Sequence, residues 1–313
     1  MKLAFALPHI IELPAITSKW EFAVTGPEQA AMVKRADELG YDMVSVPEHF
    51  VVPHSHLELS GPHYLHSTVA QAFIAGATQR IRVNSSVTIL PLHHPIVLAK
   101  ALSTADWMSG GRVTATFGVG WDAEEFAALG VRFHERGRMA DEYLAAMVEL
   151  WTRDSPSFDG KYVSFDEVAF APKPVQRPHL PIWIAGDADA ALKRAARFAS
   201  GWWPFLSPVE DVPAKLDFIK SQPAYDGRPF DVMYPLGMGR VGEGHVSSDD
   251  PNYRPGMGKQ EIVDQLCRFA ELGVTFSSVP PPRLDGPEAF LDHAQWVIEE
   301  IKPQLPTADT DGS

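Results

Sequence analysis

Short apolar runs alternate with amphipathic segments along most of the chain, and this pattern sets the expected fold. The apolar runs predict strands at 2–7, 41–46, 81–90, 112–120, 180–186, 201–205, 230–239 and 274–279. The segments between them predict helices at 27–40, 66–79, 95–111, 134–151, 187–200, 208–221 and 259–273, and a last helix carries Phe290, Ala294, Val297 and Ile301 on one face. Segment 157–178 interrupts the alternation and predicts a β-hairpin.

Strands that alternate with helices predict a parallel sheet. Eight such pairs within 313 residues favour an α/β fold closed into a (β/α)8 TIM barrel, with a doubly wound open sheet as the alternative. Insertions are expected after strands 2, 4 and 7. We expect one barrel domain over residues 1–302 and a disordered tail over 303–313, because that segment ends in the polar sequence TADTDGS.

Composition limits the partners of the chain. The 27 basic and 40 acidic side chains give a net charge of −13, which argues against nucleic acid or an anionic membrane surface as a partner. The single cysteine, Cys267, excludes an internal disulfide and fits a reducing compartment. No apolar run approaches the roughly 20 residues that a membrane helix needs. These features predict a cytoplasmic protein that acts on a small molecule.

In a TIM barrel the functional residues gather at the carboxyl ends of the strands. The expected ends carry polar, glycine-rich and aromatic residues: His9, Glu48-His49, Ser86 to Leu90, Gly118 to Trp121, Ala185-Gly186-Asp187 and Trp202. None of them is a lysine, which disfavours Schiff-base chemistry. The glycines of IWIAGD can bring backbone amides close to a phosphate at a helix N-terminus, or they can simply form a tight turn. The GxGxxG pattern of a Rossmann dinucleotide site is absent.

A metal site is the rival interpretation, because seven of the twelve histidines fall between residues 49 and 94. A metallohydrolase barrel is expected to have paired histidines at the end of an early strand and an aspartate at a late one. Here the first strand ends at His9, and the last runs into SSVPPP. We therefore predict no catalytic metal, and we interpret His54 and His56 as loop residues without a role in the site. A metal-dependent hydrolase stays as a remote alternative.

Several blocks of sequence resemble one family. GRVTATFGVGWDAEEFAALGVRFHERGRMADEYLAAMVELW, PKPVQRPHLPIWIAG and ALKRAARFASGWW, preceded by YDMVSVPEHF and SSVTILPLHHPIVLAKALSTADWMSGGR, are similar in order and spacing to the bacterial luciferase-like flavin and deazaflavin oxidoreductases. The resemblance covers most of residues 1–302. It implies a TIM-like barrel that binds FMN or coenzyme F420 at the carboxyl ends of its strands.

The resemblance also implies roles for particular residues. It implies a cis peptide between Ser86 and Val87 that supports the cofactor ring, and it implies that His49 is the catalytic acid or base or orients the cofactor. Trp121 and Trp202 are implied either to pack on the ring or substrate or to be structural aromatics. The implied cofactor-binding residues are Glu48, Ser86, Val87, Thr88, Gly118, Gly120, Trp121, Ala185, Gly186 and Asp187, and the substrate-pocket candidates are His9 and Trp202.

One departure from the sequence pattern of the family narrows the class of substrate. Trp121 stands where the sugar-phosphate dehydrogenases of this family have an acid, which argues against a sugar phosphate. Four nearby charged residues are interpreted as structural ion pairs: Glu125, Arg136, Arg138 and Glu142. The resulting hypothesis is an F420-dependent oxidoreductase that transfers hydride between the deazaflavin and a small apolar organic substrate. An FMN-dependent monooxygenase is the near alternative and a non-catalytic cofactor carrier another; a homodimer is the family expectation. The loops at 50–65 and 241–258 are expected to form the substrate entrance.

Overall fold

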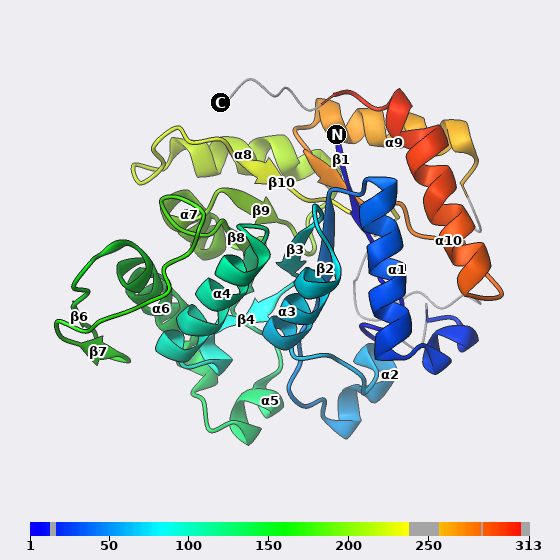
Figure 1. Ribbon diagram of the computed structural model, residues 1–313. Coiled ribbons are helices and arrows are strands. Elements are labelled where there is room, and N and C mark those ends of the chain that lie inside the picture. Colours follow the sequence, from blue (N-terminus) through cyan, green and yellow to red (C-terminus); the bar gives the residue numbers. More distant parts are fainter. Residues whose placement is uncertain (13–16, 238–256, 283, 308–313) are drawn as a thin grey trace.

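A barrel of parallel strands forms the centre of the computed structural model, which describes residues 1–12, 17–237, 257–282 and 284–307 (Figure 1). The strands are β1 (Lys2–Phe5), β2 (Met43–Val46), β3 (Arg82–Ser85) with β4 (Thr88–Ile89), β5 (Ala115–Gly118), β8 (Ile182–Ala185), β9 (Gly201–Trp203), β10 (Asp231–Val232) and β11 (Phe276–Ser277). Each lies within one of the apolar runs that the sequence predicted to be strands.

Two parallel sheets close into the barrel. One has the order β11-β1-β2-β3 and the other β10-β9-β8-β5-β4. Isolated parallel bridges from Val83 to Val113 and from Met233 to Phe276 join the two sheets at both edges. The closed (β/α)8 barrel is therefore confirmed, and the open sheet is not.

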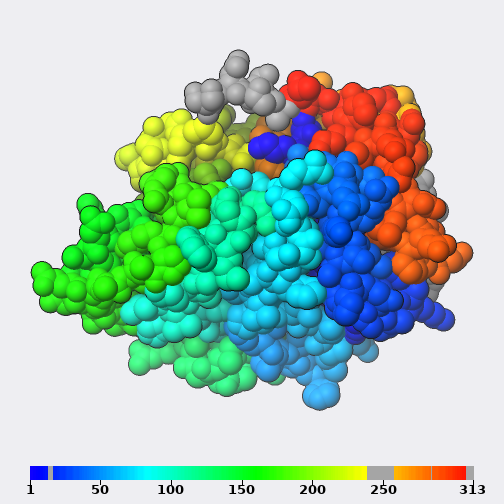
Figure 2. Space-filling view, viewed as in Figure 1, coloured from blue at the N-terminus to red at the C-terminus, as the bar shows by residue number. Residues whose placement is uncertain are grey.

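Helices cover the outside of the barrel, close to their predicted positions (Figure 1). They are α1 (Gly26–Leu39), α3 (Ser67–Ala77), α4 (Pro95–Ser109), α6 (Arg136–Thr152), α7 (Asp189–Phe198), α8 (Val212–Ser221), α9 (Lys259–Glu271) and α10 (Pro287–Trp296), which continues as a π-helical turn over Val297–Ile301. The space-filling view shows the outer faces of α1, α3 and α4 closely packed side by side on the visible side of the molecule (Figure 2). Helix α1 illustrates the local signals: Thr25 and Glu28 form a capping box at its start, and Gly40 ends it in the left-handed conformation.

The core has two parts. A large apolar layer lies between the barrel and the helices. A smaller cluster inside the barrel consists of Ala4, Met43, Trp183, Met233 and Phe276. Successive residues of a strand point to opposite faces, so each strand contributes to both layers. The inner cluster fills the barrel, so side chains at the carboxyl ends stand on a packed base.

Insertions extend the carboxyl side of the barrel. After β2 the chain forms a 3-10 turn (His54–His56) and helix α2 (Leu57–Ser60), and after β5 it forms helix α5 (Ala123–Ala128). Strands β6 (Phe158–Asp159) and β7 (Ser164–Phe165) pair in antiparallel fashion and confirm the predicted hairpin. Helices α2 and α5 lie together at the bottom of Figure 1 and mark the carboxyl side. Most of the insertion expected at 241–258 lies outside the described residues.

Two sequence expectations need correction. The strand predicted over 81–90 is divided into β3 and β4, because the cis peptide between Ser86 and Val87 interrupts it. The predicted disordered tail begins too early: residues Lys302–Gln304 form a 3-10 turn and Leu305 is buried against the core. Residues 308–313 of that tail lie outside the described part of the chain. Among the described residues, no helix is both long and apolar enough to cross a membrane.

Candidate functional site

His49 and Glu125 form a buried pair at the carboxyl side of the barrel. His49 follows β2, and Glu125 lies in the first turn of α5. The Nδ1 atom of His49 lies 2.8 Å from Oε2 of Glu125, and the other carboxylate oxygen accepts a 2.6 Å hydrogen bond from the amide of Phe50. The Glu125 side chain is 1% exposed and that of His49 is 11% exposed. Glu125 was interpreted as a structural ion pair; instead it fixes the predicted catalytic histidine.

The start of α5 supplies a second carboxylate to the same loop. Asp122 is the N-cap of α5 and accepts hydrogen bonds from the amides of Glu124 and Glu125. Its other oxygen lies 2.9 Å from Nδ1 of His56. This corrects the interpretation of His56 as a loop residue without a role, whereas His54 is exposed as expected. The two carboxylates of one short helix therefore tie the loop after β2 at two points.

Aromatic rings enclose His49. Tyr64 packs edge-on at 4.7 Å between ring centroids, and Trp121 does so at 5.8 Å. Burial raises the pKa of Tyr64 to about 12, so its hydroxyl stays protonated and donates to the carbonyl of Ser60. Trp121 also contacts the ring of His56 and is 44% exposed. Trp121 therefore lies at the surface of the site, where a bound molecule can reach it.

Glu48 lies beneath the site rather than in it. Its carboxylate, which is fully buried, accepts hydrogen bonds from the Ser67 hydroxyl at 2.6 Å, the Ile89 amide at 3.0 Å and His93 Nε2 at 2.8 Å. Burial alone raises the pKa of Glu48, but the hydrogen bonds, led by that from His93, outweigh it and leave the pKa below its ordinary value. Thr88 is also fully buried, against the Ser67 hydroxyl. These contacts fit anchoring roles better than the direct cofactor contacts that the resemblance implied for both residues.

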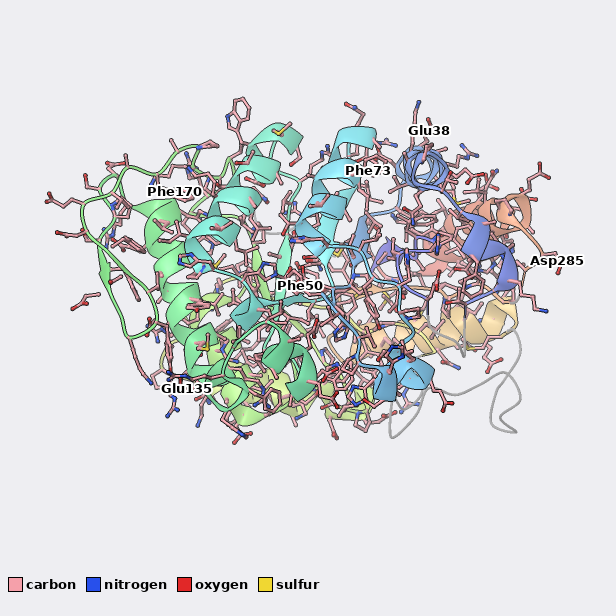
Figure 3. All side chains as sticks on the ribbon, turned by 90° about the horizontal axis from the view of Figure 1, so that it is seen from below. Glu38, Phe50, Phe73, Glu135, Phe170 and Asp285 are labelled. Atoms are coloured by element: carbon pink, nitrogen blue, oxygen red, sulfur yellow. The ribbon has the colours of Figure 1, made fainter. Side chains whose placement is uncertain are left out.

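Figure 3, seen from the carboxyl side, places Phe50 near the middle of the molecule. Its ring contacts His66 and His93, so the residue that follows His49 packs on two residues that surround Glu48. Four histidines of segment 49–94 contact carboxylates: His49 on Glu125, His56 on Asp122, and both His66 and His93 on Glu48.

The cis peptide between Ser86 and Val87 is present, as the resemblance implied. It lies opposite Gly118, where a Cβ atom would come within 2.7 Å of Val87 Cγ2. Gly120 has a φ of +77°, and a Cβ there would meet the Phe126 ring at 2.7 Å. Both glycines are therefore required by close approach. The side chains of Val87, Ile89 and Phe126 take the space that a Cβ would fill, so the glycines let the carboxyl ends of β4 and β5 pack closely.

The end of β8 differs from the prediction that the backbone amides of Ala185, Gly186 and Asp187 face a phosphate. The Gly186 amide donates to the Trp203 carbonyl at 3.1 Å and so belongs to the sheet. The Asp187 carboxylate accepts hydrogen bonds from the amides of Phe205, Leu206 and Ser207. Of the three residues predicted to meet a phosphate, Gly186 thus has its amide bonded within the protein and Asp187 has its carboxylate bonded within it. Lys215 brings a positive charge to this edge by donating to the Asp187 carbonyl at 3.0 Å.

Trp202, for which the sequence left a pocket role and a structural role open, is a structural aromatic residue. It is fully buried in the outer core, and its indole N–H donates to the Gly186 carbonyl at 2.8 Å. Its neighbour Trp203 packs instead against the inner cluster and is only partly buried. The strand register contains the signal that was missed: Trp203 pairs with Ala185, two residues beyond the inward-facing Trp183. Trp203 is therefore the aromatic residue of β9 that faces the barrel interior.

His9 is also occupied by protein contacts. Its Nδ1 lies 2.7 Å from the Val24 carbonyl, its Nε2 lies 2.8 Å from Glu12 Oε1, and its ring stacks on that of His63. Of the other charged residues interpreted as structural, Arg136 donates to the Gly120 carbonyl at 3.1 Å, and Glu142 accepts from amides of the β6–β7 hairpin. Arg136 thus supports the backbone next to Trp121.

The chain is similar to known proteins over most of its length. The family model described as luciferase-like monooxygenase matches residues 16–247. An uncharacterized protein of Mycobacterium tuberculosis is 31% identical over 284 residues, which are 85% of this chain and 92% of that protein. The FMNH2-dependent dimethylsulfone monooxygenase of Pseudomonas putida is 33% identical over 163 residues, which are 51% of this chain and 44% of that enzyme.

A solved structure has a similar fold. It is the coenzyme F420-dependent tetrahydromethanopterin reductase of Methanopyrus kandleri, with a TM-score of 0.69 and 18% sequence identity. The similarity covers 90% of this chain and 96% of that one. It supports the barrel architecture described above.

Proposed function

The chain belongs to the luciferase-like monooxygenase family, whose members are flavin- or F420-dependent oxidoreductases and monooxygenases, and we propose that it is an F420-dependent oxidoreductase. Its reaction is hydride transfer between the deazaflavin and a small apolar organic substrate. The observation that carries the proposal is the buried His49–Glu125 pair, which lies at the same carboxyl side of the barrel as the Ser86–Val87 peptide and Gly118.

The residues present fit such a cofactor. The ring would lie against Val87 and Gly118, and its phosphate would meet the amides at the start of α7, with Lys215 nearby. When bound, the deazaflavin supplies the atom that accepts or delivers hydride. The exposed apolar side chains of Val51, Trp121, Phe205 and Leu206, which follow strands at the carboxyl side, suit an apolar substrate.

In this proposal His49 is the residue that accepts a proton from the substrate or donates one to it. Because a carboxylate oxygen of Glu125 can only accept, the Nδ1 of His49 carries the hydrogen that joins them. The Nε2 atom is then left to accept a proton from the substrate or to return one, as imidazoles do near neutral pH. Glu125 holds the ring in this tautomer, and Tyr64 and Trp121 restrict its movement and exclude water from two sides.

An FMN-dependent monooxygenase is the second candidate, and the P. putida relative, an FMNH2-dependent enzyme by name, favours it. The sequence PEHFVVP after β2 favours the deazaflavin branch. Titration of the purified protein with F420 and, separately, with FMN decides between them through absorbance and fluorescence. We expect saturable binding of F420 and little response to FMN; tight binding of FMN without a response to F420 contradicts the proposal.

His49→Ala tests the proton role. Loss of an acid–base group costs turnover about 10²- to 10⁴-fold, while the affinity for the cofactor stays close to that of the wild type. His54→Ala is the matched control, because His54 is an exposed histidine of the same loop. Unchanged turnover in His49→Ala would show that His49 takes no part in the reaction. Turnover by the wild type itself argues against the alternative of a non-catalytic cofactor carrier.

We further propose that two copies of the chain associate through α3 and α4. These neighbouring helices expose five large apolar side chains: Val69, Phe73, Val97, Trp107 and Met108, each at least half exposed. Figure 3 shows Phe73 on the outer side of α3. Apolar side chains of this number on adjacent helices are typical of a surface that a partner covers. A second copy is the expected partner, because a two-fold axis lets the same apolar face serve both chains.

A further inference from the structure

The loop after β1 and the insertion after β2 meet beside the site. Ile11 and Tyr64 form an antiparallel bridge, and the Glu12 amide donates to the His63 carbonyl at 3.3 Å. This backbone contact places three possible metal ligands together: His9, Glu12 and His63. One ligand atom from each lies within 4.8 Å of the other two. The cluster is separate from the His49–Glu125 pair and has no part in the proposed function.

Hydrogen bonds to backbone carbonyls engage one ring nitrogen of each histidine, and the other nitrogen is the one that can bind an ion. The Nδ1 of His9 lies 2.7 Å from the Val24 carbonyl, to which it donates, so Nε2 is the nitrogen that can bind an ion. The Nε2 of His63 lies 3.2 Å from the His9 carbonyl, so Nδ1 is the free nitrogen of that ring. Such bonds from the second ring nitrogen to a carbonyl are typical of histidines that bind metals, because they fix the tautomer of the ring.

The donor set indicates the class of ion. Two imidazole nitrogens and one carboxylate oxygen suit zinc and similar divalent transition ions, whereas calcium and magnesium prefer oxygen ligands alone. The His9 Nε2 and the Glu12 Oε1 lie 2.8 Å apart, and their side chains are 15% and 19% exposed. An ion can therefore reach the cluster from solvent, and a water molecule can complete a tetrahedral site.

We propose that His9, Glu12 and His63 form a zinc site that fastens the β1 loop to the β2 insertion. Binding replaces the hydrogen between His9 Nε2 and Glu12 with the ion, so one proton is released to solvent. The rings of His9 and His63 now stack at 4.3 Å with an angle of 10° between their planes. Because a metal lies in the plane of each imidazole it binds, the His63 ring turns out of this stack on binding. Tyr64, the next residue, packs on His49, so the ion stiffens one wall of the site.

Zinc binding to the full chain, prepared without a histidine tag and stripped of metal, tests the proposal. We expect one zinc per chain by elemental analysis after dialysis, and an affinity reduced about tenfold or more in His9→Ala and His63→Ala. His54→Ala is the matched control and keeps the wild-type affinity. Absorption of the cobalt-substituted protein in the visible range reports a low-coordinate nitrogen-ligated site.

Glu12→Gln covers the case in which a histidine variant fails to fold, because it keeps the size of the side chain and removes its charge. Zinc is expected to raise the melting temperature of the wild type and of His54→Ala, and to raise that of Glu12→Gln less. A wild-type protein that binds no zinc overturns the proposal. Equal zinc affinity in the wild type, Glu12→Gln and the folded histidine variants does so as well.

Discussion

At the scale of single residues, Glu125 connects His49 to the backbone of the loop after β2. One carboxylate oxygen accepts from His49 Nδ1, and the other accepts from the Phe50 amide. The carboxylate is almost fully buried, so water does not compete for either bond. Its position at the start of α5 is favourable as well, because the amide groups of a helix N-terminus attract negative charge. Glu125 therefore orients the imidazole and selects its tautomer.

Glu125→Gln tests this positioning role without a substrate. The amide side chain keeps the shape of the carboxylate but removes its charge, so the preference for hydrogen on His49 Nδ1 weakens. Nitrogen-15 NMR of labelled histidine is expected to show the Nδ1–H tautomer of His49 in the wild type and a mixture of tautomers in Glu125→Gln. Glu124→Gln, one residue earlier and exposed, is the control and keeps the wild-type spectrum. An unchanged His49 tautomer in Glu125→Gln contradicts the positioning role.

At the scale of elements, Glu48 joins segments that are distant in sequence. Its carboxylate connects the end of β2 to the start of α3 through Ser67, to β4 through Ile89, and to the following loop through His93. It is fully buried, and its oxygens are supplied with donors from each of these segments. Glu48 therefore holds together the end of β2, the start of α3 and the segment that follows the cis peptide.

Glu48→Gln tests this anchor through stability. The new amide group faces donors, so we expect the free energy of unfolding to fall by about 2–3 kcal/mol at pH 7. The folded-state pKa of Glu48 lies below the unfolded value of 4.5. The carboxylate therefore contributes its stability above pH 4.5, and this contribution is lost as the pH falls through the lower, folded-state pKa.

Urea unfolding of both proteins between pH 7 and pH 3 measures this contribution. The difference between wild type and Glu48→Gln is expected to be constant above about pH 5 and to shrink below it. Glu58→Gln on α2 is the control, because Glu58 is exposed and its loss changes stability little. A difference that stays the same down to pH 3 shows that the charge on Glu48 is not what stabilises the fold.

At the scale of the whole molecule, the exposed apolar face of α3 and α4 is the feature that a single chain leaves unexplained. Trp107 and Met108 are 61% and 74% exposed, whereas the large apolar side chains of the core are buried.

Phe73→Glu places a charge on this face of α3 and α4, and we expect it to convert a dimer into a monomer. Light scattering coupled to gel filtration measures the mass, with Phe22→Glu as the control on another surface. A monomeric wild type contradicts the proposed dimer.

The fold could be predicted to a large extent from the sequence because each strand and helix has a local pattern. Strand runs, helical periodicity and terminal signals such as Thr25 and Gly40 act over a few residues. The His49–Glu125 contact joins residues 76 positions apart, and no local pattern contains it. The face of the sheet on which Trp202 lies could not be predicted for a different reason. In the three-residue strand β9, the pairing with β8 decides which side chains point inward, and this pairing cannot be read from the sequence alone.

The central proposal is that a deazaflavin binds at the carboxyl ends of β4 and β5, against Val87 and Gly118. A Cβ atom at Gly118 would press on Val87 at 2.7 Å, whereas a Cβ at Gly76 on α3 meets nothing within 4 Å. Fluorescence titration with F420 of the wild type, Gly118→Ala and Gly76→Ala therefore tests the claim directly. We expect F420 affinity to fall about tenfold or more in Gly118→Ala and to be unchanged in Gly76→Ala, with both variants folded. Equal affinity in all three proteins contradicts the placement of the cofactor at this backbone.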